Sequence, residues 1–104
     1  MIDIDPSGRL WFPSTSDNSV RSFEPRSGEF TRYELPSRNA FPLQLDIDDA
    51  GRVWVAELSS GKIAVIEPED GLIKEYTLPK HGEGALTPAP VSIVVDKDGV
   101  VLGF

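Results

Sequence analysis

Apolar and polar residues alternate in short runs along this chain, and polar turn residues separate the runs. The clearest example places Leu45 and Ile47 before the turn residues 48–51, and Val53 and Val55 after them. Alternation with a period of two is typical of β-strands with one buried face, and Asp and Gly are common in the turns that join such strands. The pattern therefore predicts a β-hairpin at this point.

The same hairpin pattern occurs three times, which indicates a repeat protein. Residues 2–11 and 93–102 repeat it, each around an Asp-x-x-Gly turn. Other residues recur 43 positions apart: Trp11 with Trp54, Glu24 with Glu67, Gly28 with Gly71, Tyr33 with Tyr76, and Pro36 with Pro79. A repeat of about 40–45 residues that contains four short strands is typical of a β-propeller blade.

We therefore expect an all-β chain made of propeller blades, each with four antiparallel strands. The strands predicted in the first unit are residues 2–5, 9–12, 20–24 and 29–35. No stretch has the hydrophobic period of a helix. The repeats divide one propeller-type domain into three parts: blade 1 at 1–41, blade 2 at 42–89 with a longer connection at 80–89, and the first hairpin of blade 3 at 90–104.

This predicted array of about two and a half blades cannot close a ring, because propellers typically have about four to eight blades. Open blade faces and free strand edges favour pairing with other chains. Three arrangements are then open. The chain associates with further copies of itself, it packs with the remaining blades of a longer protein, or its sheets stack in a way other than a propeller.

Composition and charge exclude several classes of function. The 104 residues carry a formal net charge of -7, which repels phosphate backbones and anionic lipid, so we expect no nucleic-acid or membrane partner. The sequence lacks cysteine, which excludes disulfides and cysteine nucleophiles. No signal-peptide pattern follows Met1. The compartment stays open between the cytoplasm and a secreted or periplasmic protein of which this chain is an excised part.

The repeat resembles that of the virginiamycin B lyase, or streptogramin lyase, type of β-propeller. The resemblance covers nearly the whole chain, and blade 2 carries the pattern most fully: Pro42, Asp48, Gly51, Val53, Trp54, Glu57, Ile63, Ile66, Glu67, Pro68, Gly71, Tyr76, Leu78 and Pro79. Related propellers, including NHL-repeat proteins, gluconolactonase-like proteins and periplasmic sensors, use similar units for other purposes. The resemblance implies that the first strand of each blade is innermost and the fourth is outermost.

The resemblance also implies that the two ends of the molecule differ. One end, here called the turn face, carries the turns between first and second strands and between third and fourth strands: residues 5–8, 25–28, 48–51, 68–71 and 96–99. The other end, here called the loop face, carries the remaining loops: residues 13–19, 37–41, 57–61 and 80–89. Propeller enzymes usually have their site on the loop face. We therefore expect a small molecule or a protein to bind there.

One group of acidic residues resembles a calcium loop. Asp46, Asp48, Gly51 and Glu57 match positions one, three, six and twelve of an EF-hand. Position five is Ala50, however, and the flanking residues have the pattern of strands. We therefore expect these aspartates to cap turns by accepting backbone N–H bonds.

The aromatic residues that recur once per unit are expected to pack between blades. Trp11 and Trp54 are large enough to anchor adjacent blades, with each indole N–H hydrogen-bonded. The alternative is that they stack on a sugar or another ring. We apply the packing interpretation to Tyr33 and Tyr76 as well.

His81 and Glu57 are the candidate catalytic residues. His81 is the only histidine and lies in the long connection of the loop face, while Glu57 ends the second strand of blade 2. In the lyases that the chain resembles, a histidine two residues after such a glutamate belongs to the active site, together with a second histidine and a bound Mg²⁺. Ser59 occupies that position here, so the Glu-x-His motif is absent. Glu57 is then expected to be a rim carboxylate or a hydrogen-bond acceptor in the loop.

These observations support three hypotheses about function. The leading one is a propeller segment that binds a small molecule or a protein at its loop face. The alternative is a lyase that opens a cyclic depsipeptide lactone by elimination, with His81 as general base, Glu57 nearby and Mg²⁺ as cofactor on the substrate carbonyl. Its missing histidines would come from other blades or other chains. The third hypothesis is an extracytoplasmic sensor propeller.

Overall fold

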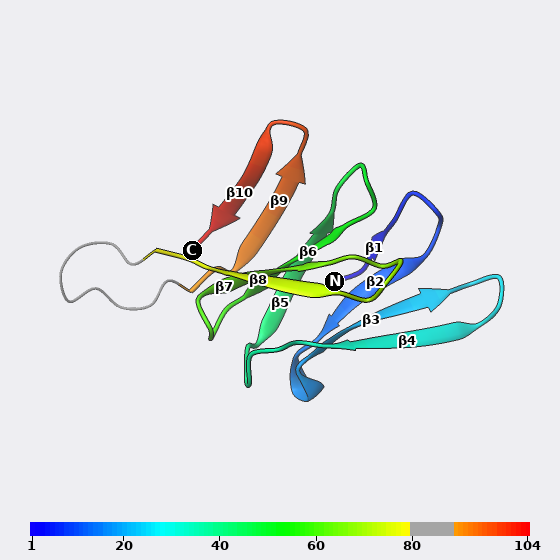
Figure 1. Ribbon diagram of the computed structural model, residues 1–104, viewed down its shortest axis with the longest axis horizontal. Helices are drawn as coiled ribbons and strands as arrows, with labels where there is room; N and C mark the ends of the chain where they lie inside the picture. Colours follow the sequence, from blue (N-terminus) through cyan, green and yellow to red (C-terminus); the bar gives the residue numbers. More distant parts are fainter. Residues whose placement is uncertain (80–88) are drawn as a thin grey trace.

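The chain folds into antiparallel β-sheets, as the sequence predicts (Figure 1). The computed structural model describes residues 1–79 and 89–104. Blade 1 has the strand order β1 (Asp3–Ile4), β2 (Leu10–Ser14), β3 (Ser19–Glu24) and β4 (Glu29–Glu34). Blade 2 repeats this order with β5 (Pro42–Ile47), β6 (Val53–Glu57), β7 (Lys62–Ile66) and β8 (Ile73–Thr77). A separate two-stranded sheet, here called the third hairpin, consists of β9 (Ser92–Asp96) and β10 (Gly99–Gly103).

A single short helical turn interrupts this pattern in the part of the chain that the structure describes. It is the 3-10 turn η1 (Thr15–Asp17), in a stretch predicted to be an irregular loop. The turn ends at Asn18, whose φ of 57° lies in the left-handed region that Asn tolerates better than most residues. Within the described residues, no helix has the length and apolar character needed to cross a membrane.

An aspartate closes the first hairpin by binding its own turn and a tryptophan at once. Asp5 Oδ1 accepts the backbone N–H groups of Ser7 at 2.9 Å and Arg9 at 3.0 Å. Its other oxygen, Oδ2, accepts the indole N–H of Trp11 at 2.9 Å. Because Asp5 and Trp11 are both buried, this carboxylate satisfies an indole that could not otherwise reach water.

Blade 2 repeats this arrangement in its own first hairpin. Asp48 Oδ1 accepts the backbone N–H groups of Ala50 and Arg52, and Oδ2 accepts the indole N–H of Trp54, each at 2.9 Å. Burial alone would raise the pKa of Asp48, but the hydrogen bonds from Trp54 and Arg52 hold that pKa below its ordinary value. The prediction that these aspartates cap turns is therefore confirmed, and so is the prediction that the indoles are bonded.

The main core lies between blades 1 and 2. Trp11, Val20 and Tyr33 share one face of blade 1, and the Trp11 and Tyr33 rings lie 5.2 Å apart. Against them pack the following buried residues of blade 2: Leu45, Val53, Val55, Ala64 and Ile66. The predicted role of Trp11 and Tyr33 as packing anchors is confirmed.

The aromatic pair of blade 2 is covered less completely. Trp54 is partly buried, and it packs against a cluster that contains Ile93 of the third hairpin. Leu102 packs against the same cluster. Tyr76 is 45% exposed, whereas its counterpart Tyr33 is 8% exposed. The packing prediction is therefore wrong for Tyr76 in the described structure. The physical reason is that the third hairpin has only two strands, and they cover the inner part of blade 2 alone.

The third hairpin differs from the first two in its pairing register. In blade 2 Ile47 pairs with Val53, but in the third hairpin Val95 pairs with Val100, one residue earlier than the repeat predicts. A shift of one residue turns every side chain of a strand to the other face. Leu102, which replaces the tryptophan of the other hairpins, therefore packs towards blade 2.

The missing tryptophan explains the tighter turn of the third hairpin. Asp96 Oδ1 accepts the backbone N–H groups of Asp98 at 2.7 Å and Gly99 at 3.1 Å. In the other hairpins the aspartate reaches residues two and four positions further on and an indole six positions further on. The side chain of Leu102 has no N–H group to donate to Asp96, so the indole bond that accompanies the wider turn in the other hairpins cannot form.

The first prediction concerns the buried indole bond. Replacing Trp11 with Phe removes the hydrogen bond to Asp5 and leaves space in a closed interface, so the free energy of unfolding should fall by about 1–3 kcal/mol. Urea denaturation measures the loss. Trp54→Phe is the matched control, because it removes the same bond from a more exposed indole, and its loss should be smaller. A loss at Trp54 equal to or larger than that at Trp11 would contradict this account of the core.

Candidate functional site

The turn face and the loop face are separate ends of the described structure. The turns that join β1 to β2, β5 to β6 and β9 to β10 lie along one edge, at the top of Figure 1. A hollow of about 470 Å³ is lined by residues of the first turn of blade 1 and of both turns of blade 2. A second hollow, of about 430 Å³, lies between the first turns of blade 2 and the third hairpin. These hollows are at the turn face, opposite the end where the sequence predicts a site.

Asn18 connects the loops of blade 1 at the loop face. Its backbone oxygen accepts the N–H of Leu35 at 3.1 Å, and its side-chain Nδ2 donates to the Ser37 carbonyl at 2.7 Å. Its Oδ1 accepts the N–H of Ala40 at 2.8 Å. Gly61 is the counterpart in blade 2 and accepts the N–H of Leu78 at 2.9 Å. The left-handed backbone therefore recurs, but Gly61 has no side chain equivalent to the amide with which Asn18 holds the outgoing loop of blade 1.

The outgoing loop of blade 1 presents an aromatic ring at the loop face. Phe41 is 43% exposed and has a φ of 55°, which is unfavourable for a bulky residue. The conformation is held by two backbone bonds from blade 2, Leu58 N–H to the Phe41 carbonyl at 3.1 Å and Ser59 N–H to the Ala40 carbonyl at 3.0 Å. Ser59, which stands where the lyase motif has histidine, is therefore next to this loop.

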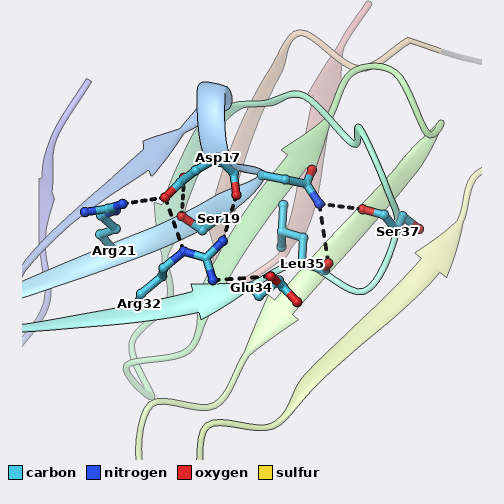
Figure 2. Close-up of polar contacts among 8 residues, drawn as sticks. Asp17, Ser19, Arg21, Arg32, Glu34, Leu35 and Ser37 are labelled. Atoms are coloured by element: carbon cyan, nitrogen blue, oxygen red, sulfur yellow. Dashed lines mark hydrogen bonds and ion pairs between the residues drawn. The ribbon is translucent and has the colours of Figure 1, made fainter.

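Asp17 is the centre of a charged cluster on blade 1 (Figure 2). Its carboxylate accepts the Ser19 hydroxyl at 2.6 Å and Arg32 Nε at 3.2 Å, and it pairs with Arg21. Arg32 also donates to the Asp17 carbonyl at 2.8 Å and to Glu34 at 3.3 Å. The hydrogen bond from Ser19, followed by that from Arg21, holds the pKa of Asp17 well below its usual range.

The Asp17 cluster was missed at the sequence level, although one signal for it exists. Arg21 and Arg32 are direct cross-strand partners in β3 and β4. Like charges placed opposite each other destabilise a sheet unless a counter-ion lies between them. Two arginines at paired strand positions therefore require a nearby carboxylate, and Asp17 supplies it.

Glu57 is buried between the blades instead of lying on the rim. Its exposed fraction is 0%, and its Oε1 accepts the Ser60 hydroxyl at 2.6 Å. Its Oε2 has no hydrogen-bond partner among the described residues. Burial, reinforced by the neighbouring Glu75 carboxyl, raises the pKa of Glu57 to about 7. Of the two alternatives expected for Glu57, the hydrogen-bond acceptor is confirmed and the rim position is wrong.

The surroundings of Glu57 connect blade 2 to blade 1. Ser37, in the outgoing loop of blade 1, donates its hydroxyl to Glu75 Oε1 at 2.9 Å and its backbone N–H to Glu75 Oε2 at 3.3 Å. Lys62 Nζ donates to the Ser37 hydroxyl at 2.8 Å and lies 3.8 Å from Glu75 Oε1. Lys62 pairs with Glu57 in the sheet. The structure therefore shows an inter-blade polar cluster of Ser37, Glu57, Ser60, Lys62 and Glu75.

This inter-blade cluster does not suit Mg²⁺. Its two carboxyls, Glu57 and Glu75, already have the Lys62 ammonium as their cationic neighbour, whereas Mg²⁺ needs several free oxygen ligands. Nowhere in residues 1–79 and 89–104 are three His, Asp or Glu side chains grouped so that they could hold a metal ion. His81, the other predicted catalytic residue, lies outside the described residues. Its proximity to Glu57 stays a prediction.

The residues of the calcium-like pattern also serve other purposes. Asp46 Oδ2 accepts the N–H of Val95 at 2.7 Å and so joins blade 2 to the third hairpin. Asp48 caps its turn, and Glu57 lies at the far end of β6. The pattern therefore describes a strand and its turn instead of a calcium loop.

Neither the family models nor the curated proteins that were compared match this chain. Solved structures do match it. Virginiamycin B lyase from Staphylococcus aureus aligns with a TM-score of 0.82 and 25% identity over 97% of this chain and 32% of the lyase chain. A catalytically inactive histidine-to-alanine variant of that lyase with quinupristin gives the same figures. The extracellular domain of a hybrid two-component system of B. thetaiotaomicron aligns with a TM-score of 0.65 and 18% identity over 99% of this chain and 19% of that one.

These alignments define the class of fold. The chain has a streptogramin-lyase-like β-propeller fold. It spans 32% of the length of the lyase structures. The likeness to the two-component system domain is a likeness of fold alone.

The second prediction concerns the pH dependence of stability. The pKa of Glu57 is about 7 in the folded chain against an ordinary value of 4.5, so between these pH values the folded state holds a proton that the unfolded state has lost. The stabilising contribution of the Glu57 proton should therefore be fully present below pH 4.5 and should be lost as the pH rises to about 7, which lowers the free energy of unfolding by up to about 3 kcal/mol. Urea denaturation at pH 5 and pH 8 measures the change.

Two substitutions separate this effect from the charges nearby. The Gln side chain of Glu57→Gln cannot titrate. The free energy of unfolding of this variant should therefore fall much less between pH 5 and pH 8 than that of the wild type, although Glu75 and Lys62 still lie beside position 57. Glu69→Gln, at an exposed turn, should keep the wild-type decrease. If Glu57→Gln keeps the full decrease, the buried carboxyl is not its source.

Proposed function

We propose that the chain is a ligand-binding segment of a larger β-propeller. It supplies neighbouring blades of a ring, and a small molecule or a protein binds at the loop face of that ring. The fold likeness over 97% of the chain supports a propeller of this type. One of the matching lyase structures contains quinupristin, so this fold accommodates a ligand in that protein.

One face of blade 1 carries the argument for a larger ring. Leu10, Phe12, Phe23 and Phe30, here called the open face of blade 1, lie on the side of the sheet opposite Trp11, as the strand register requires. Phe23 and Phe30 have ring centroids 4.6 Å apart, and Phe30 is 63% exposed. Leu10, Phe12 and Phe23 are half-buried beside it. Large apolar residues gathered at the surface in this way are typical of an interface.

The repeat shows what covers such a face. The counterparts of the open face, 43 residues further along the chain, are Val53, Val55, Ile66 and Ile73. Three of these are 0% exposed, and Ile73 packs against them, because blade 1 covers this side of blade 2. The open face of blade 1 is therefore built to receive another propeller blade in the same way. This equivalence is the observation on which the proposed function rests.

The loop face offers groups that suit a ligand. Phe41 presents an exposed ring on a strained backbone, and Ser59 is an exposed hydroxyl close to it in the neighbouring loop. Strain at a position of this kind is common in binding sites, where surrounding contacts hold a residue in a conformation it would not otherwise adopt. Within a completed ring, these loops would surround the central axis together with those of the other blades.

The third prediction concerns association. The isolated chain should associate in a concentration-dependent way, because none of residues 1–79 and 89–104 covers the exposed ring of Phe30 on the open face of blade 1. Phe30→Asp places a charge on that face and should reduce the association constant by at least about tenfold. Sedimentation equilibrium measures it, and circular dichroism verifies that the β content is unchanged.

Ala50→Asp is the control for Phe30→Asp. Ala50 is exposed in the turn between β5 and β6, at the turn face, and it belongs neither to the open face of blade 1 nor to the outer strands of blade 2. This variant should associate through that face as the wild type does. A wild-type chain that has native β content but stays monomeric over the whole concentration range would overturn the proposed function.

A lyase is the second candidate function, and the alignment with lyase structures at a TM-score of 0.82 favours it. The reaction proposed is the opening of a cyclic depsipeptide lactone by elimination: a base removes a proton beside the ester, the C–O bond breaks, and a double bond forms in the linear product. His81 would be the base. The missing Glu-x-His histidine and the Mg²⁺ ligands would come from other blades. A sensor propeller stays a third hypothesis.

The fourth prediction tests the lyase with quinupristin and Mg²⁺. Elimination gives a linear product of unchanged mass, whereas hydrolysis adds one water, so chromatography with mass spectrometry distinguishes the two. If the chain is a lyase, the linear isomer forms, and His81→Ala abolishes it while the β content is unchanged. If the chain only binds, quinupristin stays cyclic. Turnover that persists in His81→Ala would exclude His81 as the base.

A further inference from the structure

The second strand of the third hairpin has a free edge. In blade 1, β2 pairs with β1 on one side and β3 on the other, and in blade 2, β6 pairs in the same way with β5 and β7. In the part of the chain that the structure describes, β10 pairs with β9 alone. The outer edge of β10 therefore presents backbone N–H and C=O groups that are ready to pair with another strand.

A groove on blade 2 lies on the face that the third hairpin partly covers, since Trp54 lines the groove and belongs to the same apolar cluster as Leu102 of β10. It has a volume of about 310 Å³ and is lined mainly by side chains of β6, β7 and β8, including Trp54, Val65, Leu72 and Tyr76. Leu72 is 66% exposed and Tyr76 is 45% exposed. These side chains extend the apolar surface of blade 2 beyond the part that the third hairpin covers.

The covered interface between blades 1 and 2 shows what belongs in the groove. There Tyr33, the counterpart of Tyr76, is 8% exposed. It packs in the same cluster as Ile66 of β7 and Ile73 of β8, and its ring lies 4.0 Å from the position of a Cβ at Gly71. The third and fourth strands of the next blade therefore cover the tyrosine. The third hairpin has no such strands beside Tyr76 in the described structure.

We infer that the free edge of β10 and the groove on blade 2 together bind a β-hairpin that supplies the third and fourth strands of blade 3. This inference rests on the proposed function, since it names the partner that completes the ring at this end. The first strand of the incoming hairpin pairs antiparallel with β10. Its inner face carries large apolar residues, equivalent to Ile66 and Ile73, that pack on Tyr76 and Trp54.

The positive charges of Lys74 and Arg52 at the groove restrict which hairpin can bind there. Lys74 Nζ lies 5.2 Å from the centre of the Tyr76 ring, and the Arg52 guanidinium lies 5.9 Å from the Trp54 ring. Arg9 makes the same contact with Trp11, at 5.7 Å, in the covered interface, so an arginine at this position is compatible with a covering blade. Lys74 replaces the neutral Thr31 of blade 1. The incoming hairpin is therefore expected to bring an acidic or other acceptor group to Lys74.

The fifth prediction tests this site by appending a hairpin to the complete chain. Residues 58–79, which contain the loop and the two outer strands of blade 2, are added after Phe104. Because the hairpin is tethered, binding does not depend on an isolated hairpin being stable. Hydrogen exchange measured by mass spectrometry should slow by at least about tenfold in residues 99–103, and the thermal midpoint should rise.

Matched variants locate the site. An appended hairpin with Asp at the positions of Ile66 and Ile73 should give neither effect, and Leu72→Asp in the body of the chain should also remove both. Phe30→Asp should leave both intact, because the open face of blade 1 is not involved. An unmodified appended hairpin that leaves exchange in residues 99–103 unchanged would overturn the inference. Slowed exchange that survives Leu72→Asp would also overturn it, because the groove would then have no part in binding.

The result is separable from the test of the proposed function. If the appended hairpin has no effect but the chain still associates through Phe30, only the site at β10 is wrong. If the hairpin binds but the chain does not associate, the proposed covering of blade 1 is wrong. A small aromatic ligand as the occupant of the groove would protect Tyr76 without slowing exchange in β10, and that outcome too would contradict the inference.

Discussion

Trp11 connects the turn of its own hairpin to the interface between two blades, and the rest of the described structure depends on that connection. Its indole N–H is bound by Asp5, which also fixes the turn, while its ring packs on Tyr33 and the buried face of blade 2. A two-stranded hairpin is marginal by itself. The hydrogen bond between Asp5 and Trp11 therefore makes the turn and the packing between blades stabilise each other. In blade 2, Asp48 and Trp54 form the same bond on the side of the third hairpin.

The same interface explains why polar groups are buried at the loop face. Glu57, Lys62 and Glu75 share the face of blade 2 that packs on blade 1, and Ser37 of blade 1 reaches into them. A buried carboxyl is destabilising unless it is protonated or paired, which is why the pKa of Glu57 rises to about 7. In this structure Glu57 therefore contributes to the contact between blades. A catalytic role would require a substrate to reach a carboxyl that has no exposed surface.

Much of the fold could be predicted from the sequence, because strand alternation and the 43-residue spacing are local signals. The Asp-x-x-Gly turns and the buried Trp11 follow from the same pattern. The slipped register of the third hairpin did not, since it depends on Leu102 being unable to bind Asp96. The burial of Glu57 was also not predictable, because it depends on Ser37 and Glu75, which are distant in sequence. Asp17 was missed because its arginine partners become neighbours only when β3 and β4 pair.

The open face of blade 1 and the groove on blade 2 are consequences of one rule: each blade is covered across all four strands by a neighbouring blade on both of its faces. The most direct test of this rule is hydroxyl-radical footprinting of the chain over a range of concentrations, read out by mass spectrometry. The account predicts that oxidation of Phe12, Phe23 and Phe30 falls as the concentration rises, while Trp11 stays protected throughout. If the three phenylalanines stay equally reactive at every concentration, no blade covers this face, and the account is wrong.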